Sequence, residues 1–219
     1  MDRFGGETLQ GASPESTLLF ALLVALLLIQ GLARVMNPGY WQELFHSLIS
    51  LNYISLMLRE GKLRWTLTNA TLDILFLLSA TLYIEEALSL ARIDPPFWQT
   101  LAGVVGFFGG QLLLALLVGY AFYTIRYIYP FVLNMIVFNR VLGIVLLPLV
   151  VIIIYGGLLP TEAWVIGVGS IGISFLIFRA IRALFQMQGL LQHGIIYNFC
   201  YLVELAPLIL VIDRILALI

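Results

Sequence analysis

Residues 98–125 of the chain read WQTLAGVVGFFGGQLLLALLVGYAFYTI, and none of these side chains carries a formal charge. A helix needs about 20 mostly apolar residues to cross the hydrocarbon core of a bilayer. This run exceeds that length without interruption. It therefore indicates a transmembrane helix rather than the buried helix of a soluble domain.

The composition of the whole chain supports the same interpretation. Of its 219 residues, 62% are hydrophobic and 11% are charged, and the mean hydropathy is +1.05. Soluble domains carry about 25% charged residues, so a soluble fold of this size could not hide so much apolar surface. The net charge of −1 offers no basic surface for nucleic acid, and the single cysteine excludes an internal disulfide.

Five further runs are long and apolar enough to cross a bilayer. The sequence therefore predicts an all-α, polytopic membrane protein built as a bundle of six transmembrane helices. We expect residues 1–16 to be a short extracytoplasmic segment and residues 17–219 to be a single transmembrane domain. The predicted spans cover residues 17–35, 65–84, 98–125, 141–159, 163–178 and 195–212.

The distribution of basic residues predicts how these spans are oriented. Loops on the cytoplasmic side of a membrane are enriched in Lys and Arg. The loops after the first, third and fifth spans hold 8 of the 11 basic residues, which are Arg34, Arg59, Lys62, Arg64, Arg126, Arg140, Arg179 and Arg182. This bias predicts both termini on the extracytoplasmic side and the three basic loops in the cytoplasm.

Two segments do not fit the simple scheme of spans and loops. Residues 40–58 have apolar positions at helical spacing and a polar face, which predicts a helix lying in the membrane interface. Trp41 in this helix, followed by Arg59, Lys62 and Arg64, would contact lipid; a re-entrant turn is the alternative. Residues 127–139 are apolar but contain Pro130, so they form either a second interfacial helix or an early start of the fourth span.

Two acids inside predicted spans are the most informative residues. Asp73 and Glu204 both lie near the middle of a span, where a charge costs about 2.5–3.5 kcal/mol on insertion scales. They should face the bundle interior, either as hydrogen-bonding residues paired with Arg140 or Asn139 or as part of a transport path. The second span also carries several other polar residues, namely Thr68, Asn69, Thr71, Ser79 and Thr81.

Two prolines are expected to kink spans and to leave backbone carbonyls without a donor. Pro148 lies in the fourth span, and Pro207 follows Glu204 by three residues in the sixth. We also expect Arg140 and Glu204 to be coupled, because a long arginine side chain can reach a neighbouring span and Glu204 needs a partner or a proton.

Two stretches resemble a known family. The first runs through Tyr-Pro-Phe at 129–131, Phe-Asn-Arg-Val-Leu-Gly at 138–143 and Leu-Leu-Pro-Leu at 146–149, and the second is Tyr-Asn-Phe-Cys-Tyr-Leu-Val-Glu-Leu-Ala-Pro-Leu at 197–208. Together they resemble the bacterial domain-of-unknown-function family numbered four-two-seven-one. The resemblance implies a small multi-pass inner-membrane protein and no named activity. Its pattern includes Asn139, Arg140, Pro148, Glu204 and Pro207.

No catalytic, metal or cofactor motif accompanies this architecture. Gly167 to Gly172 match a dinucleotide-binding pattern, but inside a predicted span they indicate close helix packing instead. We therefore expect neither metal nor cofactor, and the partners are membrane lipids rather than nucleic acid.

Three hypotheses for function remain open. The first is a helper or subunit of a larger membrane assembly, joined to a protein partner or to further copies of itself. The contact would use small-residue faces of the third and fifth spans, such as the stripe Ala102, Gly106 and Gly110. The second is a proton-linked or small-solute transporter that uses Asp73 and Glu204. The third is an intramembrane enzyme acting on lipid, with a polar set around His46, Asn52, Arg59 and Arg64.

Overall fold

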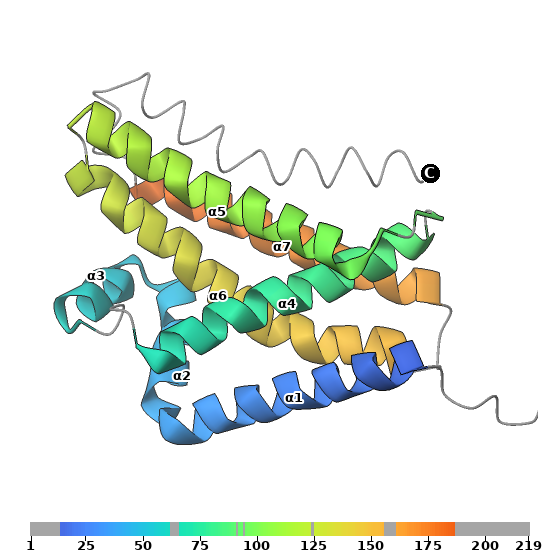
Figure 1. Ribbon diagram of the computed structural model, residues 1–219. Helices are drawn as coiled ribbons and strands as arrows, with labels where there is room; N and C mark the ends of the chain where they lie inside the picture. The colour runs from blue at the N-terminus through green and yellow to red at the C-terminus, as the bar shows by residue number, and fades with distance from the viewer. Residues whose placement is uncertain are drawn as a thin grey trace, which may run out of the picture.

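The computed structural model describes residues 14–61, 66–90, 92–93, 95–123, 125–155 and 161–186. This part of the chain is all-helical and contains seven helices (Figure 1). They are α1 (Pro14–Met36), α2 (Pro38–Ile49), α3 (Leu51–Arg59), α4 (Leu67–Leu90), α5 (Phe97–Ala121), α6 (Ile125–Tyr155) and α7 (Thr161–Gln186).

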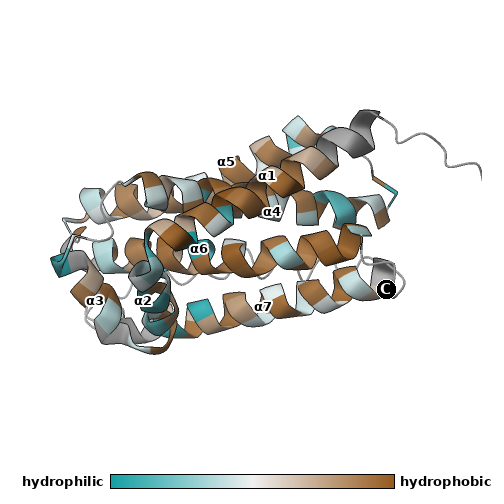
Figure 2. Ribbon diagram, turned by 90° about the horizontal axis from the view of Figure 1, so that it is seen from below, coloured by the Kyte–Doolittle hydropathy of each residue, from teal (hydrophilic) through white to brown (hydrophobic). Residues whose placement is uncertain are grey.

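Four of these helices are long and apolar enough to cross a membrane, namely α4, α5, α6 and α7. The pair formed by α1 and α2 meets the same criterion as one broken span, or as a re-entrant loop. Hydrophobic residues dominate the length of the long helices, and more hydrophilic residues lie around α2 (Figure 2). The predicted class, an apolar helical protein suited to a membrane, is therefore confirmed. The count of six and the sidedness stay predictions, because residues 195–212 lie outside the described residues.

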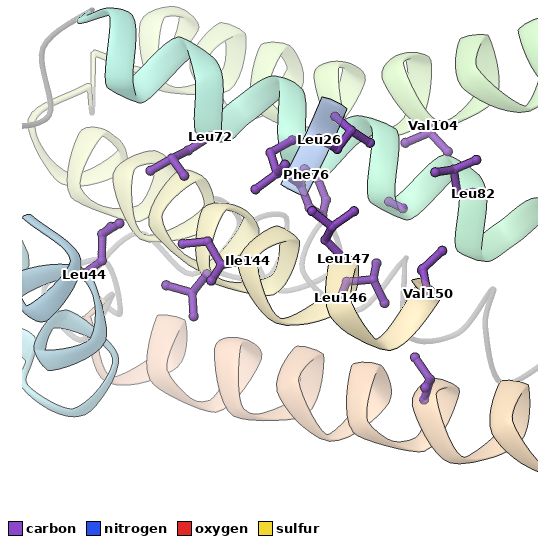
Figure 3. Close-up of a cluster of buried hydrophobic side chains, with 14 of the residues drawn as sticks. Leu26, Leu44, Leu72, Phe76, Leu82, Val104, Ile144, Leu146, Leu147 and Val150 are labelled. Carbon is purple, nitrogen blue, oxygen red and sulfur yellow. The ribbon is translucent and has the colours of Figure 1, made fainter. Parts of the chain in front are cut away.

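Helix α6 is the centre of the bundle and packs against each of the other six described helices. Its core neighbours come from several elements: Leu26 of α1, Phe76 of α4 and Leu147 of α6 belong to one buried cluster (Figure 3). Helices α4 and α6 run in the same direction and cross at Gly143. An added Cβ there would lie only 2.5 Å from the Cα of Phe76. The small residue is what lets the two backbones approach so closely.

The predicted start of the fourth span at residue 141 is wrong. Helix α6 begins at Ile125 and runs unbroken for 31 residues, so the alternative of an early start is the one the structure adopts. Pro130 is tolerated because it lies in the second turn, where its missing N–H removes one hydrogen bond near the helix start. Ile128 and Phe131 beside it are completely buried, and this packing supports the first turns.

The segment predicted as one interfacial helix at residues 40–58 is two helices. The chain bends by 98° between α1 and α2 at Asn37, and it breaks again at Ser50, whose backbone is extended (φ −111°, ψ 122°). Trp41, predicted to face lipid, is instead only 8% exposed, because α2 turns its Trp41, Leu44 and Ser47 stripe toward the bundle. Arg59 is exposed as expected. Lys62 and Arg64 lie outside the described residues.

Candidate functional site

A partly buried ion pair joins the two central helices. Arg140 of α6 donates from Nε to Oδ1 of Asp73 at 2.6 Å and from Nη2 to Oδ2 at 2.8 Å, so the pair is bidentate across α4 and α6. The Arg140 side chain is 5% exposed and that of Asp73 38%. Parallel charge-assisted bonds of this kind fix both position and angle. Because a charge inside a membrane span is costly, Asp73 was expected to have a partner in the bundle interior. Arg140 is that partner.

Tyr40 extends this pair to a third helix. The remaining terminal nitrogen of Arg140, Nη1, donates to the Tyr40 hydroxyl at 3.2 Å. That hydroxyl in turn donates to Oδ1 of Asn69, which lies one helical turn before Asp73 on α4. The result is a polar network that ties α2, α4 and α6 together inside the bundle. Such networks become more rigid when each member has a partner.

A polar pocket lies directly beside the network, between the α1–α2 bend and the start of α4. Its volume is about 360 Å³, within the range of small-molecule sites. One wall is fixed by Asn37, whose Nδ2 donates to Oγ1 of Thr68 at 2.9 Å. The lining consists of Asn37, Pro38, Gly39, Tyr40, Glu43, Thr66, Thr68 and Asn69. Tyr40 and Asn69 belong both to the polar network and to the pocket lining. The Arg140–Asp73 pair therefore lies immediately behind the pocket wall.

The chemistry of this wall favours polar ligands with hydroxyl or amide groups. Threonine and tyrosine hydroxyls and asparagine amides both donate and accept hydrogen bonds. The guanidinium behind them is already neutralised by Asp73, so it adds rigidity more than net charge. Among the described residues, no group of three or more His, Cys, Asp and Glu side chains could hold a metal ion.

Comparison with known proteins identifies the family. The family described as "Domain of unknown function (DUF4271)" matches residues 19–215, which is most of the chain. The chain belongs to the DUF4271 family. No curated protein and no solved structure matches it. The family resemblance predicted from the sequence is confirmed, and since the family description names no activity, function has to be argued from the site.

The structure places two further predicted residues of this DUF4271 chain outside the Arg140–Asp73 network. Asn139 accepts a hydrogen bond from Nη1 of Arg179 on α7 at 2.9 Å, and both side chains are buried. Pro148 lies inside α6 with an exposed ring, away from the polar network. Glu204 and Pro207 lie outside the described residues, so the predicted coupling of Arg140 with Glu204 stays a prediction.

Sequence reasoning on this DUF4271 chain missed Tyr40 and Asn37. One available signal was the polar run at Thr68 and Asn69, which marks one wall of the pocket. The other wall exists only because the chain turns by 98° at Asn37, and this turn carries Tyr40 back against α4 and α6. The sequence Asn-Pro-Gly at 37–39 indicates a turn but does not give its angle or what it brings together.

Proposed function

We propose that this chain is a multi-pass inner-membrane protein that binds a small hydroxylated solute in the pocket at the α1–α2 bend and carries it across the membrane. The observation that supports this proposal is a pocket of about 360 Å³ with several polar lining residues, placed against the partly buried Arg140–Asp73 pair. Ion pairs in the interior of membrane bundles commonly mark substrate and ion pathways.

The bend itself supports the proposal. Irregular backbone at membrane depth is tolerated where it is buried in protein or lines a cavity, and transporters use broken helices at their binding sites. Asn37, the residue between α1 and α2, lines the pocket. The Tyr40 hydroxyl links the Arg140–Asp73 pair to α2, which carries part of the pocket lining.

Replacing Thr68 by Val tests the pocket. The change removes the hydroxyl that accepts from Asn37 and leaves the shape nearly unchanged, so solute flux should fall about 3- to 10-fold. Flux is measured by stopped-flow light scattering of proteoliposomes exposed to glycerol, ribitol or glucose. The matched control is Thr81→Val on the same helix, whose buried hydroxyl bonds only the Leu77 carbonyl. Equal rates in protein-containing and empty liposomes for all three solutes would reject the proposal.

A subunit of a larger membrane assembly is the second candidate, and helix α5 favours it. A Cβ added at Gly103, Gly106, Gly109 or Gly110 would meet nothing within 4 Å. These glycines therefore do not serve packing against the described part of the chain. A glycine-rich helix face allows a second helix to approach closely in a membrane.

Replacing Gly106 by Leu tests this second candidate. The larger side chain would block close approach on α5, so a complex crosslinked in native membranes should be lost and the monomer recovered in mild detergent. Gly31→Leu on α1 is the control, because Gly31 is equally open. Recovery of the same monomer from the unaltered chain after crosslinking would count against an assembly role. No observation in the described residues favours the lipid-enzyme hypothesis over these two.

A further inference from the structure

A second buried cation lies on α7, apart from the pocket. Arg182 is 5% exposed, its Nη2 donates to the Ser50 carbonyl at 2.8 Å, and its guanidinium lies 5.6 Å from the centre of the Phe138 ring. Its Nε and Nη1 are buried without a hydrogen-bond partner in the structure. Among the described residues no carboxylate forms an ion pair with it. Arg182 therefore has only neutral acceptors for a full positive charge.

Asn134 of α6 is a second buried group without a partner. Its side chain is fully buried, and neither its amide nitrogen nor its amide oxygen has a hydrogen bond. Phe138, which stacks under Arg182, lies four residues further along and so on the same face of α6. Helices α6 and α7 run in opposite directions, since Arg179 pairs with Asn139 and Ala183 packs in one cluster with Met135. Asn134 consequently lies beside the last turns of α7, as Arg182 does.

The side chains of Arg182 and Asn134 both have buried polar atoms that lack hydrogen-bonding partners. A buried guanidinium without a counter-charge and a buried amide without a bond are both costly, and both are relieved by an acceptor-rich anion. Phosphate oxygens accept from guanidinium and amide donors alike, and arginine is the residue most used for phosphate. This end of the bundle also carries the exposed Arg59 of α3. At this end of the bundle, the phosphate group would come from a lipid headgroup or from phosphate in solution.

We propose that Arg182 and Asn134 form a phosphate-binding site between α6 and α7, beside the break that separates α2 from α3. The ligand is a phosphate group, supplied either by a phospholipid headgroup or by free inorganic phosphate. The site is independent of the transport pocket, because it uses no residue of the pocket lining or of the Arg140–Asp73 pair.

Binding to the full chain in detergent tests the site with two probes. Inorganic phosphate is titrated by calorimetry, and retention of phosphatidylglycerol is compared by native mass spectrometry with that of the phosphate-free lipid monogalactosyldiacylglycerol. Arg182→Gln should weaken binding of the true ligand roughly 10- to 100-fold, as expected for loss of a charge-assisted contact. Arg34→Gln, which removes an exposed charge on α1, should leave phosphate binding unchanged.

Asn134→Leu is the second variant and guards against misfolding. It replaces an unpartnered buried amide by an apolar side chain of the same branching, so the thermal midpoint without ligand should rise while phosphate binding falls. If both variants lose phosphate binding by calorimetry, the ligand is free phosphate. If both lose selective retention of phosphatidylglycerol, the ligand is a lipid headgroup. Equal binding of both probes by the unaltered chain and the two variants, or no binding at all, would overturn the proposal.

Discussion

Replacing Asp73 by Leu should lower the free energy of unfolding by about 3 kcal/mol, the lower end of the range for breaking a buried ion pair. The change leaves Arg140, which is only 5% exposed, as a cation with the Tyr40 hydroxyl as its remaining partner. The lower end applies because Asp73 is 38% exposed, so part of the pair is screened. Unfolding of the purified chain by denaturant in detergent measures the loss.

The reverse substitution should be milder. Arg140→Met leaves Asp73 without its partner, but that carboxyl is partly exposed, so less of its charge stays in an apolar environment. The double variant Asp73→Leu with Arg140→Met should recover most of the lost stability, because no charge then stays buried without a partner. If the double variant loses the sum of the two single losses, the two residues do not act as a pair.

Replacing Gly143 by Ala should have the second largest effect, with a loss of about 1–3 kcal/mol or more. The new Cβ would lie 2.5 Å from the Cα and 2.9 Å from the backbone nitrogen of Phe76, and backbone atoms cannot rotate away as a flexible side chain can. Helices α4 and α6 would have to separate, which also strains the Arg140–Asp73 pair one turn away. The measurement is the same unfolding experiment, combined with the thermal midpoint.

Gly106→Ala on α5 is the matched control for this crowding. A Cβ at Gly106 meets nothing within 4 Å, and alanine favours a helix over glycine by up to about 1 kcal/mol. The control should therefore be neutral or slightly stabilising. Equal losses at Gly143 and Gly106 would show that helix propensity rather than contact with Phe76 sets the effect.

The helical membrane class was predictable because it depends on composition and run length alone. The spans expected at 65–84, 98–125 and 163–178 correspond to α4, α5 and α7, with ends displaced by a few residues. Hydropathy cannot fix such ends, since helices continue past the apolar run wherever hydrogen bonds and packing allow it. The predicted start of the fourth span was wrong for a related reason. Arg140 and Pro130 look like boundary residues, yet tertiary contacts with Asp73 and the buried residues around Ile128 keep both inside one helix.

The candidate site was predictable only in part. The cost of a charge at mid-depth singled out Asp73 and pointed to an interior partner, and Arg140 was among the partners considered. The pocket, Tyr40 and the unpartnered Asn134 were not foreseen, because each depends on how helices distant in sequence meet. Asn134 in particular lies in an apolar run, where one amide carries no periodic signal.

The same-direction crossing of α4 and α6 has a consequence for how the chain is made. Arg140 follows Asp73 by 67 residues, with the whole of α5 between them. Synthesis adds a few to about 20 residues per second, so Asp73 is made well before Arg140. For several seconds the nascent chain therefore holds Asp73 of α4 without its Arg140 partner. Helix α4 therefore has its Arg140 partner only when α6 has been made, and α7, which also packs against α4, follows later.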